Sequence, residues 1–291
     1  MSKKILSLLI TAGLFVIVML YSCEKDIKIN IPNAPTKIVV EAWIDLNDYP
    51  IVLLTKSLPF FGTIDSAMLA SLIIQDATVV VSDGFSTDTL AKIFDPNYLP
   101  YIQYKGTKIK GVAGRIYSLT VKDEGQTLTA TTTIPPPIPL DSAWFKVQPS
   151  MDSLGYVWAT FTDPPQPGNY YRIFTKRLSI DKIFIPELGS VYEDRFFNGQ
   201  TLTFSILRGP SSNISPTSDP EATYYKKGET IIIKTCTIDQ VQYNFWRSAE
   251  NEVYGGGNPF VNPSQIPTNI NGGGLGVWGG YGCSFDTVIA K

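Results

Sequence analysis

The sequence contains no histidine. Without histidine the chain has no Ser-His-Asp or Cys-His catalytic group, and it cannot form the common histidine-containing zinc site. P-loop, C-x-x-C and EF-hand motifs are missing as well. Acid–base chemistry would therefore depend on carboxylates, lysines or tyrosines, and we expect neither a metal nor a cofactor.

The sequence also lacks an excess of positive charge. Lysine and arginine together number 24 and aspartate and glutamate 26, for a net charge of −2. No basic stripe occurs in any segment, so we expect no nucleic-acid partner. Hydrophobic residues make up 44% of the chain, which is enough for packed cores and argues against disorder.

A short export signal is indicated at the N-terminus. Lys3 and Lys4 precede an uncharged segment at 5–20, and Ser22-Cys23 is followed at once by polar residues. This pattern resembles a bacterial lipoprotein signal. We therefore expect a signal peptide at 1–22, a lipid on Cys23, a membrane partner through that lipid, and a proline-containing tether at 23–36. An uncut membrane anchor and a buried core helix are the alternatives.

Two further cysteines remain, Cys236 and Cys283. An even pair in an exported domain is a candidate disulfide. Two separately buried thiols are the alternative, because cysteine is often a small core residue.

Short β-branched and aromatic segments separated by turn residues predict an all-β fold. The expected strands are 37–46, 51–57, 77–82, 87–93, 115–122, 126–134, 142–148, 155–162, 169–178, 201–207, 229–238 and 283–290. We expect two β-sandwich (Ig-like) domains in tandem. The first spans 37–134, a proline-rich linker occupies 135–139, and a β-rich domain with one helix spans 140–291.

The strongest helix prediction is 239–253, with a weaker one at 65–74. Asp239 can cap the longer helix. Its expected apolar face consists of Val241, Phe245 and Ala249, with Gln242 and Trp246 beside them.

Two motifs and one set of carboxylates could carry chemistry, and the contexts of the two motifs argue against it. A G-x-G-x-x-G run at 274–279 leads into a strand, whereas a dinucleotide site needs it to open a helix. An S-x-x-K match at 179–182 lies in a strand-like segment, without the partner motifs of a serine acyl-enzyme. Asp163, Glu193 and Asp194 leave a carboxylate-based hydrolase open as an alternative.

The glycine-rich stretch 255–282 predicts a long loop. Such a loop either contacts a partner or docks onto its own domain. The candidate contact residues are Asn258, Pro259, Phe260, Asn269, Trp278 and Tyr281.

Several segments resemble one family, the Bacteroidetes-type lipoproteins with domain of unknown function 4249. They are KIVVEAWI (37–44), DATVVVSDG (76–84), GRIYSLTV (114–121), NYYRI (169–173) and, most specifically, GNPF…PTNINGGGLGVWGGY (257–281). The resemblance implies an outer-membrane lipoprotein, often encoded beside a TonB-dependent receptor. Lys25-Asp26 is similar to a signal that sends some lipoproteins to the cell surface.

From these features we expect a non-enzymatic binding or accessory partner of a TonB-dependent transporter, at the outer membrane. It would capture substrate or cap the receptor, and its ligand is not specified by the sequence. A structural or assembly lipoprotein of the envelope is the alternative, with the carboxylate hydrolase behind it. The resemblance transfers no catalytic residues.

Overall fold

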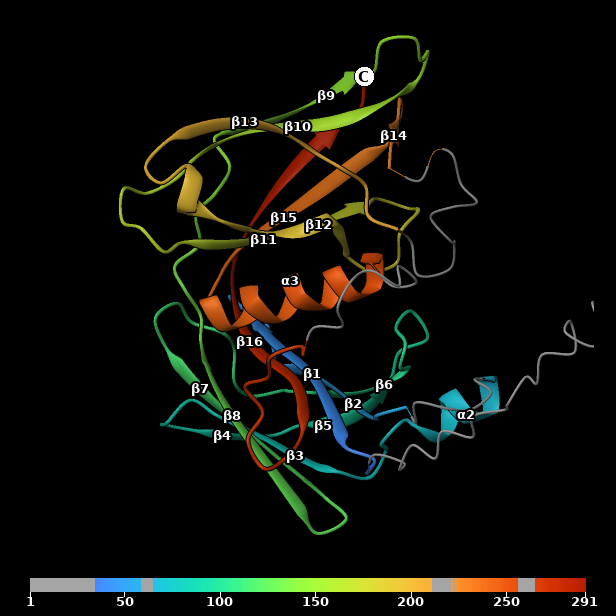
Figure 1. Ribbon diagram of the computed structural model, residues 1–291, viewed down its shortest axis with the longest axis vertical. Coiled ribbons are helices and arrows are strands. Elements are labelled where there is room, and N and C mark those ends of the chain that lie inside the picture. Colours follow the sequence, from blue (N-terminus) through green and yellow to red (C-terminus); the bar gives the residue numbers. More distant parts are fainter. Residues whose placement is uncertain (1–34, 59–64, 211–220, 222, 256–264) are drawn as a thin grey trace, which may run out of the picture. The chain divides into compact units, whose positions relative to one another are not determined.

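The computed structural model of the chain describes residues 35–58, 65–210, 221, 223–255 and 265–291 (Figure 1). The predicted signal peptide and Cys23 lie outside these residues. The chain divides into the units Met1–Pro35 and Thr36–Lys291. All described strands and hydrophobic cores belong to Thr36–Lys291, so this unit contains what it needs to fold. None of the described helices is long and apolar enough to cross a membrane.

Strands dominate the described residues, as the sequence predicts. The strands are β1 (Ile38–Asp45), β2 (Ile51–Lys56), β3 (Thr78–Ser82), β4 (Thr87–Thr89), β5 (Ala91–Phe94), β6 (Ile102–Lys105), β7 (Ile116–Asp123), β8 (Gln126–Thr133), β9 (Ser142–Val147), β10 (Leu154–Thr162), β11 (Tyr170–Arg177), β12 (Ile185–Glu193), β13 (Thr201–Ile206), β14 (Tyr225–Lys226), β15 (Thr230–Ile238) and β16 (Leu275–Ile289). The helices are α2 (Ser66–Ser71), α3 (Gln240–Gly255) and the short 3₁₀ turn η1 (Asp194–Phe196).

The strands form one large and two small sheets, which confirms the all-β, sandwich-like fold. The large sheet has the order β12-β11-β15-β16-β1-β2-β6-β5. One small sheet has the order β4-β3-β7-β8. The other has the order β13-β10-β14, with β9 paired to β10.

The alternating strands build the first core. In β7, Tyr117, Leu119 and Val121 are buried, while their neighbours face outward, because successive side chains point to opposite faces of a sheet. They pack against Val40 and Leu54 of the large sheet. The second core repeats this arrangement between β10 and the pair β11–β15. Residues 135–139 lie in the chain between Ile134 of the first core and Leu140 of the second, although Ile270 and Trp278 also belong to the first core.

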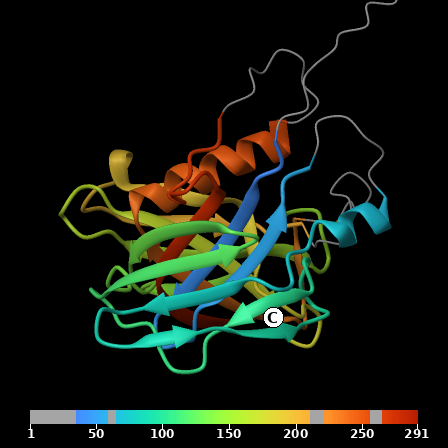
Figure 2. The same ribbon diagram turned by 90° about the horizontal axis from the view of Figure 1, so that it is seen from below.

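The linker does not separate two independent sheets, because β16 belongs to both halves. Its first part, Leu275–Tyr281, pairs in parallel with β1, and its last part pairs with β15 in the antiparallel direction. Figures 1 and 2 show β16 (dark red) beside β1 (blue), with α3 running across the middle of the unit. One sheet therefore continues through both sandwiches.

The last strand, predicted at 283–290, is confirmed over 283–289 but begins earlier, at Leu275, so the loop predicted at 255–282 is wrong over 275–282. Residues 275–282 are strand, and most of them are buried. Glycine is needed there for close approach. A side chain at Gly280 would collide with the carbonyl oxygen of Thr133, and one at Gly279 with the Gln242 side chain of α3. Both faces of β16 are therefore covered at contact distance.

The helix prediction is confirmed in position and cap. The backbone N–H of Gln242 donates to the Asp239 carboxylate at 2.8 Å. The predicted apolar face is wrong, because Val241 is 45% exposed whereas Gln242 and Tyr243 are buried. The glycines of β16 cause this, since they leave room for the long Gln242 side chain, whose amide donates to the Gly280 carbonyl at 2.9 Å.

Two strands are not apparent from the sequence. β12 contains Pro186 and Gly189, which interrupt a regular strand pattern, and its pairing with β11 carries an irregularity. β14 is only two residues long and forms through its partner β10.

Candidate functional site

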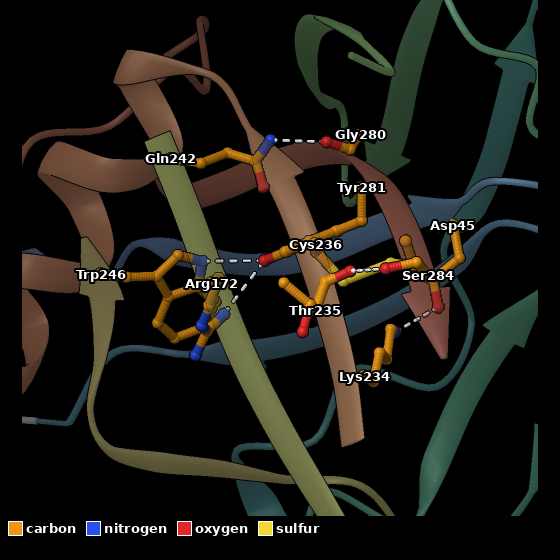
Figure 3. The surroundings of a disulfide bond; sticks show 11 residues. Asp45, Arg172, Lys234, Thr235, Cys236, Gln242, Trp246, Gly280, Tyr281 and Ser284 are labelled. Atoms are coloured by element: carbon orange, nitrogen blue, oxygen red, sulfur yellow. Dashed lines mark hydrogen bonds and ion pairs between the residues drawn. A yellow bond between two sulfur atoms is a disulfide. The ribbon is translucent and has the colours of Figure 1, made fainter. Parts of the chain in front are cut away.

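The two halves meet in a polar and aromatic group under α3, here called the junction cluster (Figure 3). It consists of Asp45, Arg172, Lys234, Trp246 and Tyr281, which come from β1, β11, β15, α3 and β16. The disulfide between Cys236 and Cys283 lies among them. Charged groups buried at such a place are candidates for function, so their contacts decide what they can do.

Arg172 is the central cation of the junction cluster. Its guanidinium lies 3.5 Å from the centre of the Trp246 ring and donates to the Tyr281 hydroxyl at 3.0 Å. The Trp246 indole N–H donates to the same hydroxyl, also at 3.0 Å. Burial raises the pKa of Tyr281, with Arg172 opposing that shift, so the hydroxyl stays neutral near pH 7. The buried polar groups of Arg172, Trp246 and Tyr281 thus serve as hydrogen-bond partners for one another.

A second contact of Arg172 connects it to the helix. Its Nε donates to the Ser190 hydroxyl at 3.1 Å, and the backbone N–H of Ser190 donates to the Glu250 carboxylate at 3.0 Å. The Ser190 hydroxyl also donates to Glu250. A continuous polar path therefore runs from β11 through β12 to the last turns of α3.

The other cation, Lys234, forms an ion pair with Asp45. Its ammonium lies 5.2 Å from the centre of the Phe174 ring and 5.8 Å from that of Tyr281. Lys234 is on β15 and Asp45 ends β1, so the pair spans the strand between them, β16. This ion pair and the disulfide both lie where the pairing of β16 changes from β1 to β15.

The predicted contact residues divide between three locations. Trp278 is fully buried in the first core, and its indole N–H donates to the Tyr117 carbonyl at 3.2 Å. Asn269 docks onto the same strand, since its amide bonds the backbone N–H and carbonyl of Trp278 at 2.9 and 2.8 Å. Tyr281 belongs to the junction cluster. Asn258, Pro259 and Phe260 lie outside the described residues.

Internal docking is therefore the outcome for the described part of the glycine-rich stretch. A surface for a partner cannot include Trp278 or Tyr281, because both side chains are buried. Cys236 and Cys283, the candidate disulfide of the sequence, are bonded to each other.

The three carboxylates considered for a hydrolase have structural partners. Asp163 accepts from the Tyr171 hydroxyl and from the backbone N–H of Gly199. Asp194 accepts from the backbone N–H groups of Gly168 and Asn169 at 2.8 and 2.9 Å. Glu193 pairs with Arg195 at 3.3 Å. The first two hold turns in place, which is a common use of buried aspartates.

A buried carboxyl that the sequence does not single out is Glu187. It accepts from the Tyr192 hydroxyl at 2.8 Å and from the backbone N–H of Leu207 at 3.0 Å. Burial raises its pKa to about 8, with the charge of Glu250 adding to the effect. Glu187 is therefore mostly protonated at neutral pH.

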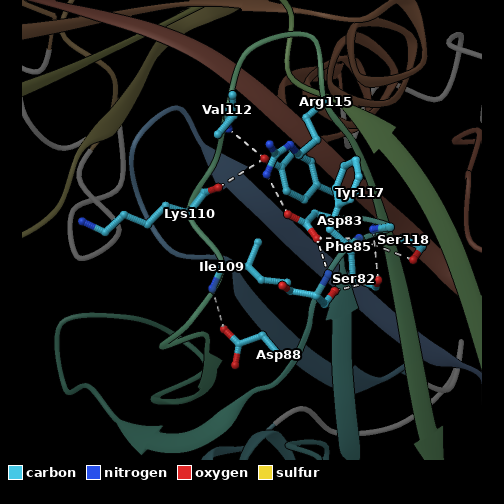
Figure 4. Close-up of polar contacts among 12 residues, drawn as sticks. Ser82, Asp83, Phe85, Asp88, Ile109, Lys110, Val112, Arg115, Tyr117 and Ser118 are labelled. Carbon is cyan, nitrogen blue, oxygen red and sulfur yellow. Dashed lines mark hydrogen bonds and ion pairs between the residues drawn. The ribbon is translucent and has the colours of Figure 1, made fainter.

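Two further aspartates organise the first sandwich (Figure 4). Asp88 accepts from three consecutive backbone N–H groups, those of Thr107, Lys108 and Ile109. Asp83 caps the turn at Phe85 and binds Arg115 at 2.7 Å. Hydrogen bonds from the turn and the Arg115 charge hold the pKa of Asp83 below its usual range. These carboxylates stabilise turns.

The geometry assigns the junction cluster a bracing role. Its cations bind an internal carboxylate, a hydroxyl and aromatic rings, and in the part of the chain that the structure describes no three metal-ligating residues converge. The sequence analysis does not single out Arg172 and Lys234 as site residues, although their sequence context contains a signal. Each is a lone charge within an otherwise apolar strand segment, NYYRI or TIIIK.

Comparison with known protein families identifies one family. No curated protein matches the chain significantly. A family model described as a domain of unknown function, DUF4249, matches residues 24–284, which include the junction cluster and most of both sandwiches. The chain therefore belongs to the DUF4249 family.

Proposed function

We propose that this protein is a lipid-anchored, non-enzymatic accessory partner of a TonB-dependent transporter at the outer membrane. The observation that carries the anchor is the Ser22-Cys23 junction after an apolar signal. The family match begins at residue 24, directly after that cysteine. The disulfide fits export too, because such bonds persist in oxidising compartments.

The receptor part of the proposal comes from the family resemblance, and the fold supplies a surface for it. The hairpin of β5 and β6 forms the outer end of the large sheet, opposite to β12. Phe94 on β5 is 64% exposed, and Leu99 in the connecting turn is 77% exposed. The ring centres of Phe94 and Tyr101 lie 5.4 Å apart. Exposed apolar groups at an unpaired sheet edge are typical of protein contacts.

The anchor is tested by replacing Cys23 with serine. The variant should leave the washed membrane fraction, because the acyl chains that hold the protein at the membrane would be missing. Retention of Cys23→Ser in washed membranes would contradict the lipoprotein assignment.

The receptor contact is tested by co-purification from detergent-solubilised membranes. The wild-type chain should bring down a large β-barrel, and the double variant Phe94→Ser, Leu99→Ser should lose it at unchanged thermal stability. Phe196→Ser is the matched control, because Phe196 is an 84% exposed aromatic in the other sandwich. A wild-type protein that retains no barrel, or equal losses in both variants, would refute this contact.

A further inference from the structure

The second sandwich holds an apolar cavity of about 470 Å³ between its two sheets, which is partly open to solvent. This volume lies within the range of small-molecule sites in proteins. The wall includes Leu140, Phe161, Ile173, Leu202, Phe204 and Thr235. None of the lining residues carries a charge. A ligand inside it would therefore be buried in an uncharged form, since a charge would lack a partner.

The cavity has an entrance at the free edge of the sandwich. β12 ends the large sheet and β13 ends the small one, so these two edge strands lie without a common ladder. The ring centres of Tyr192 on β12 and Phe204 on β13 lie 6.3 Å apart, with the ring planes tilted. Tyr192, Phe204 and Leu202 are all partly exposed.

Two polar groups in the wall have no hydrogen-bond partner within the described residues, the Thr235 hydroxyl and the Trp158 indole N–H. The Thr235 hydroxyl oxygen is buried, makes no hydrogen bond within the described residues, and belongs to a side chain that is only 2% exposed. An unsatisfied buried hydroxyl costs about 1–3 kcal/mol, so such groups usually have a use. By contrast, the hydroxyls of Tyr171 and Tyr192, which also line the cavity, are bound to Asp163 and Glu187.

We propose that this cavity is a binding site for an uncharged, apolar small molecule with one polar group that hydrogen-bonds to Thr235. The site goes beyond the proposed function, since binding here requires neither the anchor nor the receptor.

The test uses the anchor-free chain from Glu24 to Lys291, which contains the complete compact unit and needs no detergent. The probe is N-phenyl-1-naphthylamine, an uncharged fluorophore with one amine. Its fluorescence should rise saturably with the wild type. Leu202→Trp fills the entrance and should weaken binding about tenfold or more, whereas Thr203→Trp, the neighbouring outward position on β13, should leave it unchanged.

A second variant tests the polar contact. Thr235→Val keeps the side-chain shape and removes the hydroxyl, so it should weaken probe binding a few-fold while thermal stability stays equal or increases. Three results would overturn the site: no saturable binding by the wild type, equal losses in the two tryptophan variants, or full affinity in Thr235→Val. All three can be read whether or not the chain is a lipoprotein, so failure here is separate from failure of the proposed function.

Discussion

Cys236 of β15 and Cys283 of β16 are direct cross-strand partners with 4.1 Å between their Cα atoms, and their disulfide lies two residues beyond the last pairing of β16 with β1. The bond thus stands where one strand passes from the first sandwich to the second. Two residues before Cys236 on β15, Lys234 reaches across β16 to Asp45. The two contacts hold the halves of the large sheet together.

The disulfide should contribute strongly to stability. It closes a loop over a sequence separation of 47, which in the chain-entropy model corresponds to about 4 kcal/mol. The double variant Cys236→Ala, Cys283→Ala should therefore unfold at clearly lower denaturant concentration. Cys23→Ser serves as the control, because Cys23 lies outside the compact unit. Two free thiols in exported protein, measured by non-reducing mass spectrometry, would contradict the bond.

The Tyr281 hydroxyl should be worth more than an ordinary surface hydroxyl. Tyr281→Phe removes the acceptor of both Arg172 and Trp246, and we expect a loss of about 1–3 kcal/mol in chemical unfolding. Tyr101→Phe, on the partly exposed β5–β6 hairpin, should change stability by less than about 0.5 kcal/mol. Equal effects of the two variants would show that the junction cluster does not brace the fold.

Stability should depend on pH through Glu187. Its folded-state pKa of about 8 lies above the ordinary value of 4.5, so the folded protein holds this proton more tightly than the unfolded chain does. This contribution is present below about pH 4.5 and is lost as the pH rises through about 8. Glu187→Gln should reduce the fall in melting temperature between pH 5 and pH 9. If the melting temperature of Glu187→Gln falls with pH as much as that of the wild type, a group other than Glu187 causes the pH dependence.

The glycines of β16 should resist substitution for a steric reason. A side chain at Gly276 would collide with the Val40 carbonyl, and its φ of +106° adds strain, so Gly276→Ala should cost more than about 2 kcal/mol. Gly114 is a matched control with a φ of +77° but open space around it. Gly114→Ala should cost only the conformational strain of about 1–2 kcal/mol. Thermal unfolding of both variants distinguishes collision from strain.

Elements whose signals are local can be predicted from the sequence alone. Strand alternation in β7 and the Asp239 cap of α3 depend on neighbouring residues, so both are readable from the chain. The two cores and the break between them at 135–139 follow from the same patterns. The pairing of Cys236 with Cys283 was also open to prediction as an even pair.

Features that depend on residues distant in the sequence become visible only in the folded protein. Residues 275–282 look like a loop because glycine disfavours strands, yet β1, α3 and the chain at Thr133 surround them and need the missing side chains. Gln242 is buried for the same reason. Arg172 becomes acceptable in the interior only when Trp246 and Tyr281, far away in the sequence, meet its guanidinium. Packing between remote segments, which no local pattern encodes, therefore placed the junction cluster and the cavity.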